Sequence, residues 1–326
     1  MNPKIFIGPM SKNTVDSVIE FCNNTGNIIG LIPSRRQIEY NGGYVNNWTT
    51  KEFSDYVKNK TDKIIIQRDH SGPSQGQYND DGYESLKHDC MFFDLIHIDP
   101  WKKYQDYEDG LKATSDMINF CYNLNPLIEY EIGTEESIRR FESNELDKLV
   151  NDLKIILNPE IFKKIKILVI QSGTSLKGNN QTGNYDKNRL IEMVDVAKKH
   201  KLISKEHNGD YISTVTIKEK FDLGLDCINI APEFGLLETD VFLDEIVKSW
   251  SFSLMDVFFN ICYESKKWEK WVNSDFNPLE KRFETIKISG HYIFSNKDFI
   301  EKIKSNFNGI DNIIKLKIKN KLNELH

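Results

Sequence analysis

The stretch Ile64-Ile65-Ile66-Gln67-Arg68-Asp69-His70-Ser71-Gly72-Pro73 decides how this chain folds. Three consecutive isoleucines without polar alternation are typical of a strand buried on both faces, as in a parallel sheet. An acid and an imidazole, Asp69 and His70, end this strand before Gly72-Pro73 breaks it. Enzymes with parallel sheets place catalytic groups at such strand ends. The alternative interpretation is that Asp69 caps the next helix beside a surface His70.

The same strand-then-helix pattern recurs along the chain and predicts a (β/α)8 TIM barrel, an α/β fold. Apolar runs begin near residues 4, 27, 63, 92, 127, 165, 202 and 227, with helical segments between them. An open, doubly wound sheet is the alternative, although no GxGxxG or P-loop motif supports a nucleotide-binding version. We expect the barrel over residues 1–262 and a C-terminal, mainly helical extension packed on it over residues 263–326. Residues 241–261 are expected to form a long apolar helical segment, the last barrel helix plus an extension, and Thr49 and Glu52 a capping box.

Composition indicates a soluble globular protein, with 39% hydrophobic and 28% charged residues among 326. The net charge of −6 argues against a nucleic-acid partner. No apolar run is long enough to cross a bilayer, and the first residues lack the apolar segment of a signal peptide. Five cysteines without CxxC spacing predict reduced, buried thiols and no structural zinc. We therefore expect a cytoplasmic protein that binds neither membrane nor nucleic acid.

Polar side chains end four of the predicted strands, and a barrel would bring these ends to one face. They are Asp69 and His70, then His97 and Asp99, then Glu131 and Glu135, then Lys205, Glu206 and His207. Two imidazoles and one or two carboxylates at one point can hold a divalent metal such as zinc, with an open position for substrate. The metal would polarise a carbonyl and stabilise an enediolate while a carboxylate moves the proton. Each residue taken alone is equally interpretable as a strand-end cap.

The other histidines and the last two strand ends give less specific signals. His88, His200, His291 and His326 lie in predicted helices or tails, where a structural or exposed role is expected. Asn208-Gly209 and residues 229–232 follow the last two strands, where barrels often bind phosphate through backbone N–H groups. Two ordinary loops are the alternative interpretation.

A series of short motifs, in the same order over most of the chain, resembles the accessory (non-catalytic) subunit family of tagatose-bisphosphate aldolase, within the class II metal-dependent aldolase superfamily. The motifs are Gly42-Gly43-Tyr44, Asp69-His70-x-Gly72-Pro73, Ile96-His97-Ile98-Asp99, Ile132-Gly133-Thr134-Glu135, Val169-Ile170-Gln171-x-Gly173, Glu206-His207-x-x-Asp210-Tyr211 and His291-Tyr292-Ile293-Phe294-Ser295.

The resemblance implies a TIM barrel, sugar-phosphate substrates and a set of roles. It implies that Asp69 moves protons, that His70 and His207 bind zinc, that Glu131 lies near the metal and that Glu135 assists proton transfer. One position departs from the family pattern. Catalytic members carry a zinc histidine after strand six, where this chain reads Ser175-Leu176-Lys177-Gly178. A protonated lysine cannot ligate zinc, so the metal site is either rebuilt with Glu131 or Asp99, or absent.

The leading hypothesis is a class II-like metal-dependent aldolase, a carbon–carbon lyase acting on a phosphorylated ketose or related sugar. Its catalytic residues would be Asp69 and Glu135, and its divalent metal, with zinc expected, would be held by His70, His207 and Glu131. Substrate contacts are expected from Asp99, His97, Gln171, Lys177, Lys205, Asn208, Gly209 and Asn229.

Three alternatives remain open at this stage. The first is a non-catalytic subunit that stabilises a catalytic aldolase partner, with a homo-oligomer as the other expected assembly. The second is a metal-dependent sugar epimerase or isomerase, which would begin by polarising the same carbonyl. The third is a Schiff-base aldolase using Lys205 or Lys177, which would need a lysine pKa lowered by burial.

Overall fold

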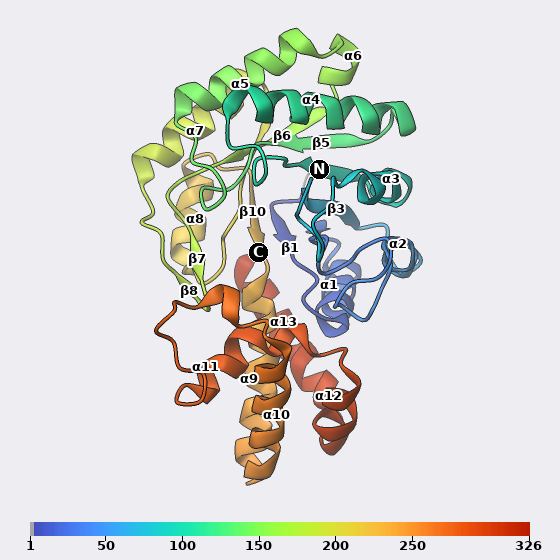
Figure 1. Cartoon of the computed structure of the whole chain (residues 1–326), viewed down its shortest axis with the longest axis vertical. Coiled ribbons are helices and arrows are strands. Elements are labelled where there is room, and N and C mark those ends of the chain that lie inside the picture. Colours follow the sequence, from blue (N-terminus) through green and yellow to red (C-terminus); the bar gives the residue numbers. More distant parts are fainter. Residues whose placement is uncertain (1–2) are drawn as a thin grey trace.

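The computed structural model describes residues 3–326, in which eight parallel strands close into a barrel (Figure 1). The predicted TIM barrel is therefore confirmed. The strands lie around the barrel in the order β1, β2, β3, β4, β5, β6, β9 and β10, and β10 pairs with β1 to close it. Their bounds are β1 (Ile5–Ile7), β2 (Ile29–Leu31), β3 (Ile64–Ser71), β4 (Leu95–Ile98), β5 (Glu129–Ile132), β6 (Ile165–Ile170), β9 (Ile203–Glu206) and β10 (Cys227–Ile230).

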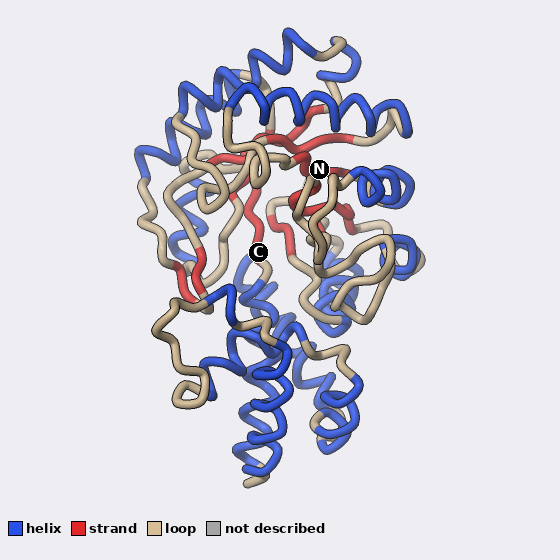
Figure 2. The backbone as a smooth tube through the Cα atoms, viewed as in Figure 1, coloured by secondary structure: helices blue, strands red, loops and turns tan. Residues whose placement is uncertain are grey.

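Helices surround the strands, which occupy the centre of the upper part of the molecule (Figure 2). The helices that follow the strands are α1 (Lys12–Thr25), α2 (Thr50–Lys58), α3 (Tyr83–Phe92), α4 (Tyr107–Leu124), α5 (Ser143–Ile156), α6 (Pro159–Phe162), α7 (Lys187–Lys199), α8 (Thr214–Asp222) and α9 (Pro232–Lys248). The predicted capping box starts α2, because the Thr49 side chain and Glu52 each accept from the other's backbone N–H.

The strands alternate between two environments. The residues on their outer faces join the large apolar core beneath the helices, as Ile5, Ile66 and Ile228 do. A second, smaller cluster fills the barrel interior, and its buried members are Phe6, Ile32, Leu95, Ile167 and Cys227. Toward the carboxyl ends of β3, β4, β5 and β9, the inward-facing residues are polar, as Gln67, His97, Glu131 and Lys205 are. The interior is thus apolar at one end and carries the chemically active side chains at the carboxyl end.

The C-terminal part of the chain contains only helices and loops (Figure 2). Its elements are α10 (Phe252–Ser265), η1 (Glu269–Trp271), α11 (Arg282–Ser289), η2 (Gly290–Tyr292), α12 (Lys297–Lys302), η3 (Lys304–Asn306) and α13 (Ile310–Leu325). In Figure 1, α10, α11 and α12 project below the barrel, while α13 packs on α1 and α9. The placement of a domain boundary after residue 262 stays a prediction.

Two local features add to the expected pattern. The helical segment expected over residues 241–261 consists of the last barrel helix and an extension, because α9 ends at Lys248 and Trp250 adopts a left-handed φ of 54° before α10 begins. The polar loop after β6 contains an unpredicted hairpin, formed by β7 (Leu176–Lys177) and β8 (Asn180–Gln181). Within residues 3–326, no helix combines the length and apolar character needed to span a bilayer. All five cysteines are free and buried, as expected.

Candidate active site

A backbone irregularity in β3 brings two consecutive side chains to the same side of the sheet. Successive side chains of a regular strand point to opposite faces, so Asp69 and His70 should diverge. The pairing of β3 with β4 shifts register between Arg68 and Ser71, and His70 takes a left-handed φ of 44°. Such a bulge re-aims a side chain. Both Asp69 and His70 therefore line the cavity at the carboxyl end of the barrel.

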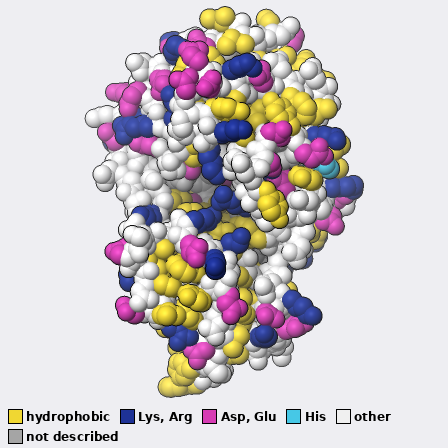
Figure 3. All heavy atoms as spheres, in the orientation of Figure 1, with side chains coloured by type: hydrophobic (Ala, Val, Ile, Leu, Met, Phe, Trp, Pro, Cys, Tyr) yellow, Lys and Arg dark blue, Asp and Glu magenta, His cyan; other side chains and the backbone are white. Residues whose placement is uncertain are grey.

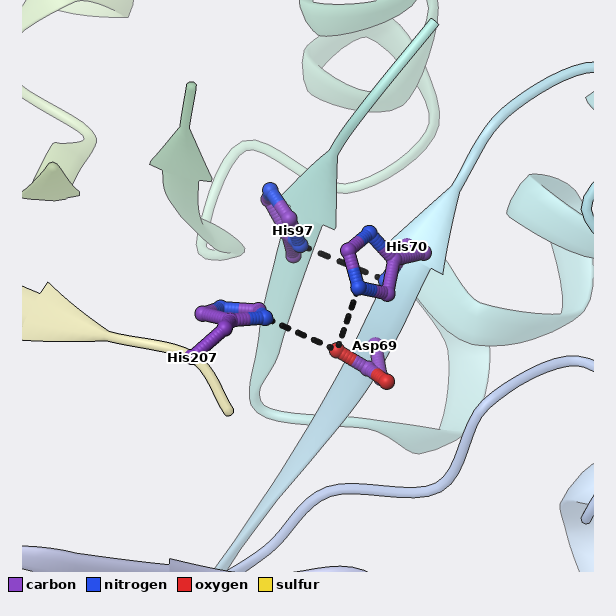
Figure 4. A group of neighbouring side chains, drawn as sticks. All are labelled: Asp69, His70, His97 and His207. Atoms are coloured by element: carbon purple, nitrogen blue, oxygen red, sulfur yellow. Dashed lines mark hydrogen bonds and ion pairs between the residues drawn. The ribbon is translucent and has the colours of Figure 1, made fainter. Parts of the chain in front are cut away.

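Three imidazoles and one carboxylate converge at this point (Figure 4). Asp69 and His70 come from β3, His97 from β4, and His207 follows β9. Each offers one ligand atom, and the four atoms all lie within 4.8 Å of one another. The ring centroids of His70, His97 and His207 are 4.9–5.1 Å apart. The three strand ends that the sequence placed far apart along the chain thus meet as predicted in one place.

In each imidazole, one ring nitrogen contacts an oxygen outside the cluster. His70 Nδ1 lies 2.6 Å from an oxygen of Asp99, and His207 Nε2 lies 2.7 Å from an oxygen of Glu131. His97 Nε2 lies 3.0 Å from the backbone carbonyl of Gly133. These contacts place a proton on the outer nitrogen and leave the inner nitrogen facing the cluster. Histidines that bind metals are oriented in this way.

The two carboxylates behind the imidazoles are themselves held by hydrogen bonds. Thr134 Oγ1 donates to Asp99 at 2.9 Å. Glu131 accepts from Lys205 Nζ at 2.8 Å and from Gln67 Nε2 at 2.7 Å, inside the barrel. Burial alone would raise the pKa of Glu131, but Lys205 and the neighbouring imidazoles hold it well below its usual range. Glu131 therefore stays ionised and keeps the His207 ring in place.

The protonation of the cluster is asymmetric. Burial opposes a charge on His70, yet the Asp69 and Asp99 carboxylates raise the pKa of its imidazole to about 10, so this ring would have to release its inner proton to bind a metal. Burial lowers the pKa of His97 to about 4, so that ring is neutral. The backbone N–H of His70 donates to His97 Nδ1 over a long distance of 3.3 Å, so this nitrogen is the acceptor in the contact.

The residues present fit a divalent metal. Asp69 Oδ1 is buried and has no hydrogen-bond partner among the described residues. It lies 3.6 Å from His207 Nδ1 and 3.7 Å from His70 Nε2. A buried carboxylate oxygen without a partner costs free energy, and a cation at this point would satisfy it. The donor set of imidazole nitrogens and carboxylate oxygen is also one that zinc accepts. Glu131, expected as a ligand, instead lies behind His207, and His97 supplies the third imidazole.

The cluster opens into a cavity of about 330 Å³. Glu135, Asn208 and Asn229 line it, as expected for residues that contact substrate or move protons. Asn229 Oδ1 is buried and lacks a hydrogen-bond partner among residues 3–326, so it is available to a ligand. Glu135 stands half-buried and accepts a hydrogen bond from Ser137 at 2.6 Å.

Several residues expected to contact substrate do not line this cavity. Asp99, His97 and Lys205 are wholly buried behind it, and Gln171 is used up in bonds to the backbone of Thr134, Arg139 and Phe141. Lys177 lies on β7 with its amine on Asn273, at the surface. Gly209 lies next to the cavity, but its N–H donates to Asn229 O at 2.8 Å and is not free for phosphate. None of these residues therefore faces the cavity directly.

Sequence reasoning missed part of the cavity wall. His291, expected to be structural or exposed, is buried in η2 and lines the cavity together with Tyr292 and Tyr44. Their rings pack on one another, with centroids 3.9–6.1 Å apart. Arg36, Lys102 and Lys270 also line it. Nothing in the sequence distinguished these three cations from the others, since only the fold brings them together.

Comparison with solved structures identifies other proteins with this fold. A probable tagatose 6-phosphate kinase from Sinorhizobium meliloti 1021 matches with a TM-score of 0.81 and 15% identity, over 99% of each chain. Fructose-bisphosphate aldolase from Campylobacter jejuni matches with a TM-score of 0.60 and 12% identity, over 99% of this chain and 90% of that one. The YdjI aldolase from Escherichia coli K12 matches with a TM-score of 0.53 and 14% identity, over 93% of each chain.

The TM-scores show a shared fold over nearly the full length of the chain, and the low identities show no more than the fold. No family model matches the sequence, and no curated protein matches it at the sequence level.

Proposed function

We propose that this protein is a metal-dependent aldolase that cleaves a carbon–carbon bond in a phosphorylated ketose or a related sugar. The observation that carries the proposal is the convergence of three anchored imidazoles on the unpartnered oxygen of Asp69. The aldolases that share the fold support it as an analogy. The name of the S. meliloti protein suggests a kinase, but this sequence has no glycine-rich phosphate-binding motif that would favour a kinase.

In this proposal His70, His97 and His207 hold the divalent metal, with zinc expected. The metal would supply Lewis-acid polarisation of the substrate carbonyl. Asp99, Glu131 and the Gly133 carbonyl keep the imidazoles oriented through the bonds described above. The Lys205–Glu131 pair supports this arrangement from inside the barrel. A Schiff base on Lys205 does not fit, because its amine is buried, charged against Glu131 and outside the cavity.

Asp69 is the proposed general base. Its carboxylate would accept the proton of the hydroxyl on the carbon that becomes the aldehyde. The carbon–carbon bond then breaks, and its electron pair moves onto the carbonyl side of the sugar. Glu135, which lies in the loop after β5 and lines the same cavity, would return a proton to the carbon that carried this bond. Asn229 and Asn208 would hold sugar hydroxyls, since both face the cavity and Asn229 Oδ1 is unpaired.

Metal analysis and activity assays on purified protein test this function together. We expect about one bound divalent metal per chain and cleavage of a phosphorylated ketose that a chelator abolishes. Asp69→Asn should lower kcat by at least about 100-fold while the protein remains folded. His88→Ala, which changes a histidine on the surface of α3, is the matched control. Cleavage that survives both metal removal and Asp69→Asn would contradict the proposal.

A non-catalytic subunit of an aldolase complex is the second candidate. The observation in its favour is that β7 carries an exposed Lys177, well away from the imidazole cluster, where the family resemblance implies a metal ligand. Co-purification from its native cells separates the two candidates. A metal-bearing chain that is stable and active alone would exclude the subunit role, whereas activity only with a co-purified aldolase would establish it. Release of the epimer rather than an aldehyde would identify an epimerase.

A further inference from the structure

The mouth of the cavity carries three cations from three separate parts of the chain. Arg36 lies between β2 and α2, Lys102 follows β4, and Lys270 lies in η1 of the C-terminal part. All three line the same cavity as Asp69 and His207. Figure 3 shows Lys and Arg side chains gathered in the hollow at the middle of this face.

None of these three cations pairs with a carboxylate in the part of the chain that the structure describes. Arg36 Nε donates to the Gly76 carbonyl at 3.2 Å, and Lys102 Nζ to the Ser74 carbonyl at 2.8 Å. Both are thereby tied to the loop after β3. Lys270 Nζ lies over the rings of Trp271 and Tyr292, at 4.5 and 5.0 Å from their centroids. The groups are positioned, yet their charge is not neutralised.

The neighbouring Arg35 shows the contrast. Its guanidinium lies 2.7 Å from Glu39 and 2.5 Å from Asp80, so this arginine is fully neutralised inside the protein. Arg36, one residue later, points to the cavity without such a partner. Of these two adjacent arginines, Arg35 forms structural ion pairs, whereas Arg36 is an unpaired cation at the mouth of the cavity.

The three cations also act on one another. Partial burial lowers the pKa of Lys102, and Arg36 lowers it further. Burial, and then Arg36, Lys267 and Lys102, lower the pKa of Lys270 to about 7, so an anion bound beside it would restore the full charge of its amine at neutral pH. Like charges held together in this way oppose each other, and an anion between them would relieve the repulsion. The carboxylates of the cavity, including Asp69 and Glu135, lie too far from these cations to form ion pairs.

We propose that Arg36, Lys102 and Lys270 form the binding site for the phosphate group of the substrate. This inference rests on the proposed function, and it names the end of the cavity at which the phosphorylated end of the sugar lies. A phosphate dianion offers three acceptor oxygens, which match one guanidinium and two ammonium groups. The cavity of about 330 Å³ is large enough for a small sugar phosphate. The site also assigns a task to the C-terminal part, which supplies Lys270.

Calorimetric titration of chelator-treated protein with dihydroxyacetone phosphate and with unphosphorylated dihydroxyacetone tests the site. We expect only the phosphorylated compound to bind measurably. Lys102→Gln, Lys270→Gln and Arg36→Gln should each weaken this binding by about tenfold or more. Lys103→Gln, which changes the adjacent exposed lysine outside the cavity, is the matched control and should alter binding by less than about twofold.

The outcomes separate this site from the proposed reaction. No turnover is measured and the metal is removed, so phosphate binding that depends on the three cations would stand even if the protein had no aldolase activity. Equal weakening by Lys102→Gln and Lys103→Gln, or equal affinity for both ketoses, would overturn the site and leave the reaction untouched. Inorganic phosphate and acetate serve as further probes. Acetate binding as tightly as phosphate would show a carboxylate site and reject the proposal.

Discussion

At the scale of single residues, the candidate site depends on which nitrogen of each histidine is anchored. Asp99, Glu131 and Gly133 each take one ring nitrogen of a different imidazole. The other nitrogen is left for a ligand. His97 is wholly buried and neutral, and its inner nitrogen has only the long contact with the backbone N–H of His70. Its pattern in the sequence, Ile96-His97-Ile98, is equally compatible with a core histidine. The fold makes it the third imidazole of the cluster.

His97→Gln tests the assignment of His97 as a metal ligand. Glutamine keeps much of the volume of the ring but loses the imidazole nitrogen. We expect metal affinity to fall by at least about tenfold, as measured by competition with a colorimetric chelator. His200→Gln, which changes a histidine bound to Asp147 just after α7, should leave metal affinity unchanged. Unchanged metal affinity in a folded His97→Gln protein would remove His97 from the ligand set.

At the scale of the elements, the bulge in β3 and the Lys205–Glu131 pair inside the barrel both position side chains of the candidate site. The bulge turns His70 toward Asp69, against the alternation of a regular strand. Lys205 on β9 and Glu131 on β5 lie opposite each other in the interior, and both are completely buried. This charged pair occupies the barrel interior beside the apolar cluster of Phe6, Ile32, Leu95, Ile167 and Cys227. A buried pair of this kind is stable only while both partners are present.

Lys205→Met removes one partner of that pair. The Glu131 carboxylate would be left buried near Gln67 without its cation, so we expect the free energy of unfolding to fall by about 3–5 kcal/mol. Urea denaturation of chelator-treated protein measures it. Lys166→Met, which breaks the exposed pair of Lys166 and Glu129, should cost less than about 1 kcal/mol. Similar losses in both variants would mean that the interior pair has no special role.

At the scale of the whole molecule, one buried carboxyl joins the C-terminal helices to the start of the chain. Glu238, on α9, accepts hydrogen bonds from Ser11 and from Asn13 Nδ2 at the beginning of α1. Asn13 Nδ2 also donates to Asp311 on α13 at 2.8 Å. Burial raises the pKa of Glu238 to about 7, while Ser11, Asn13 and Lys304 oppose the shift and Asp311 adds to it. This carboxyl therefore holds its proton in the folded protein well above the pH at which an unfolded chain releases it.

The pKa of Glu238 predicts a pH dependence of stability. The folded state binds more protons than the unfolded state between about pH 4.5 and 7, so the contribution of Glu238 to stability is present below this window and is lost as pH rises through it. Glu238→Gln removes the effect. Relative to the unchanged protein, the variant should gain roughly 2–3 kcal/mol between pH 5 and pH 8 in denaturation experiments.

Asp244→Asn, an exposed carboxyl on the same helix, is the control and should show no such gain. A stability difference between Glu238→Gln and the unchanged protein that stays constant from pH 5 to pH 8 would refute the assignment.

Local patterns were sufficient for the fold and for most of the cluster. The apolar runs predicted strands buried on both faces, and their eightfold recurrence favoured a barrel over an open, doubly wound sheet. Since parallel strands end on one face, Asp69, His70 and His207 could be expected to meet. Strand ends were less accurate, as β3 continues to Ser71 through the bulge. The break at Trp250 and the β7–β8 hairpin had no signal that periodicity could detect.

The sequence by itself determined the class of fold, the end of the barrel at which chemistry is placed and the residue types that meet there. Only the tertiary structure decided that His97, and not Glu131, joins Asp69, His70 and His207. It also decided that Lys205 is the buried ion-pair partner of Glu131 and that three cations share one cavity mouth. The reason is physical. Periodicity reports which face of an element is buried, whereas the direction of a ring nitrogen or a free cation depends on atoms contributed by strands and loops far apart along the chain.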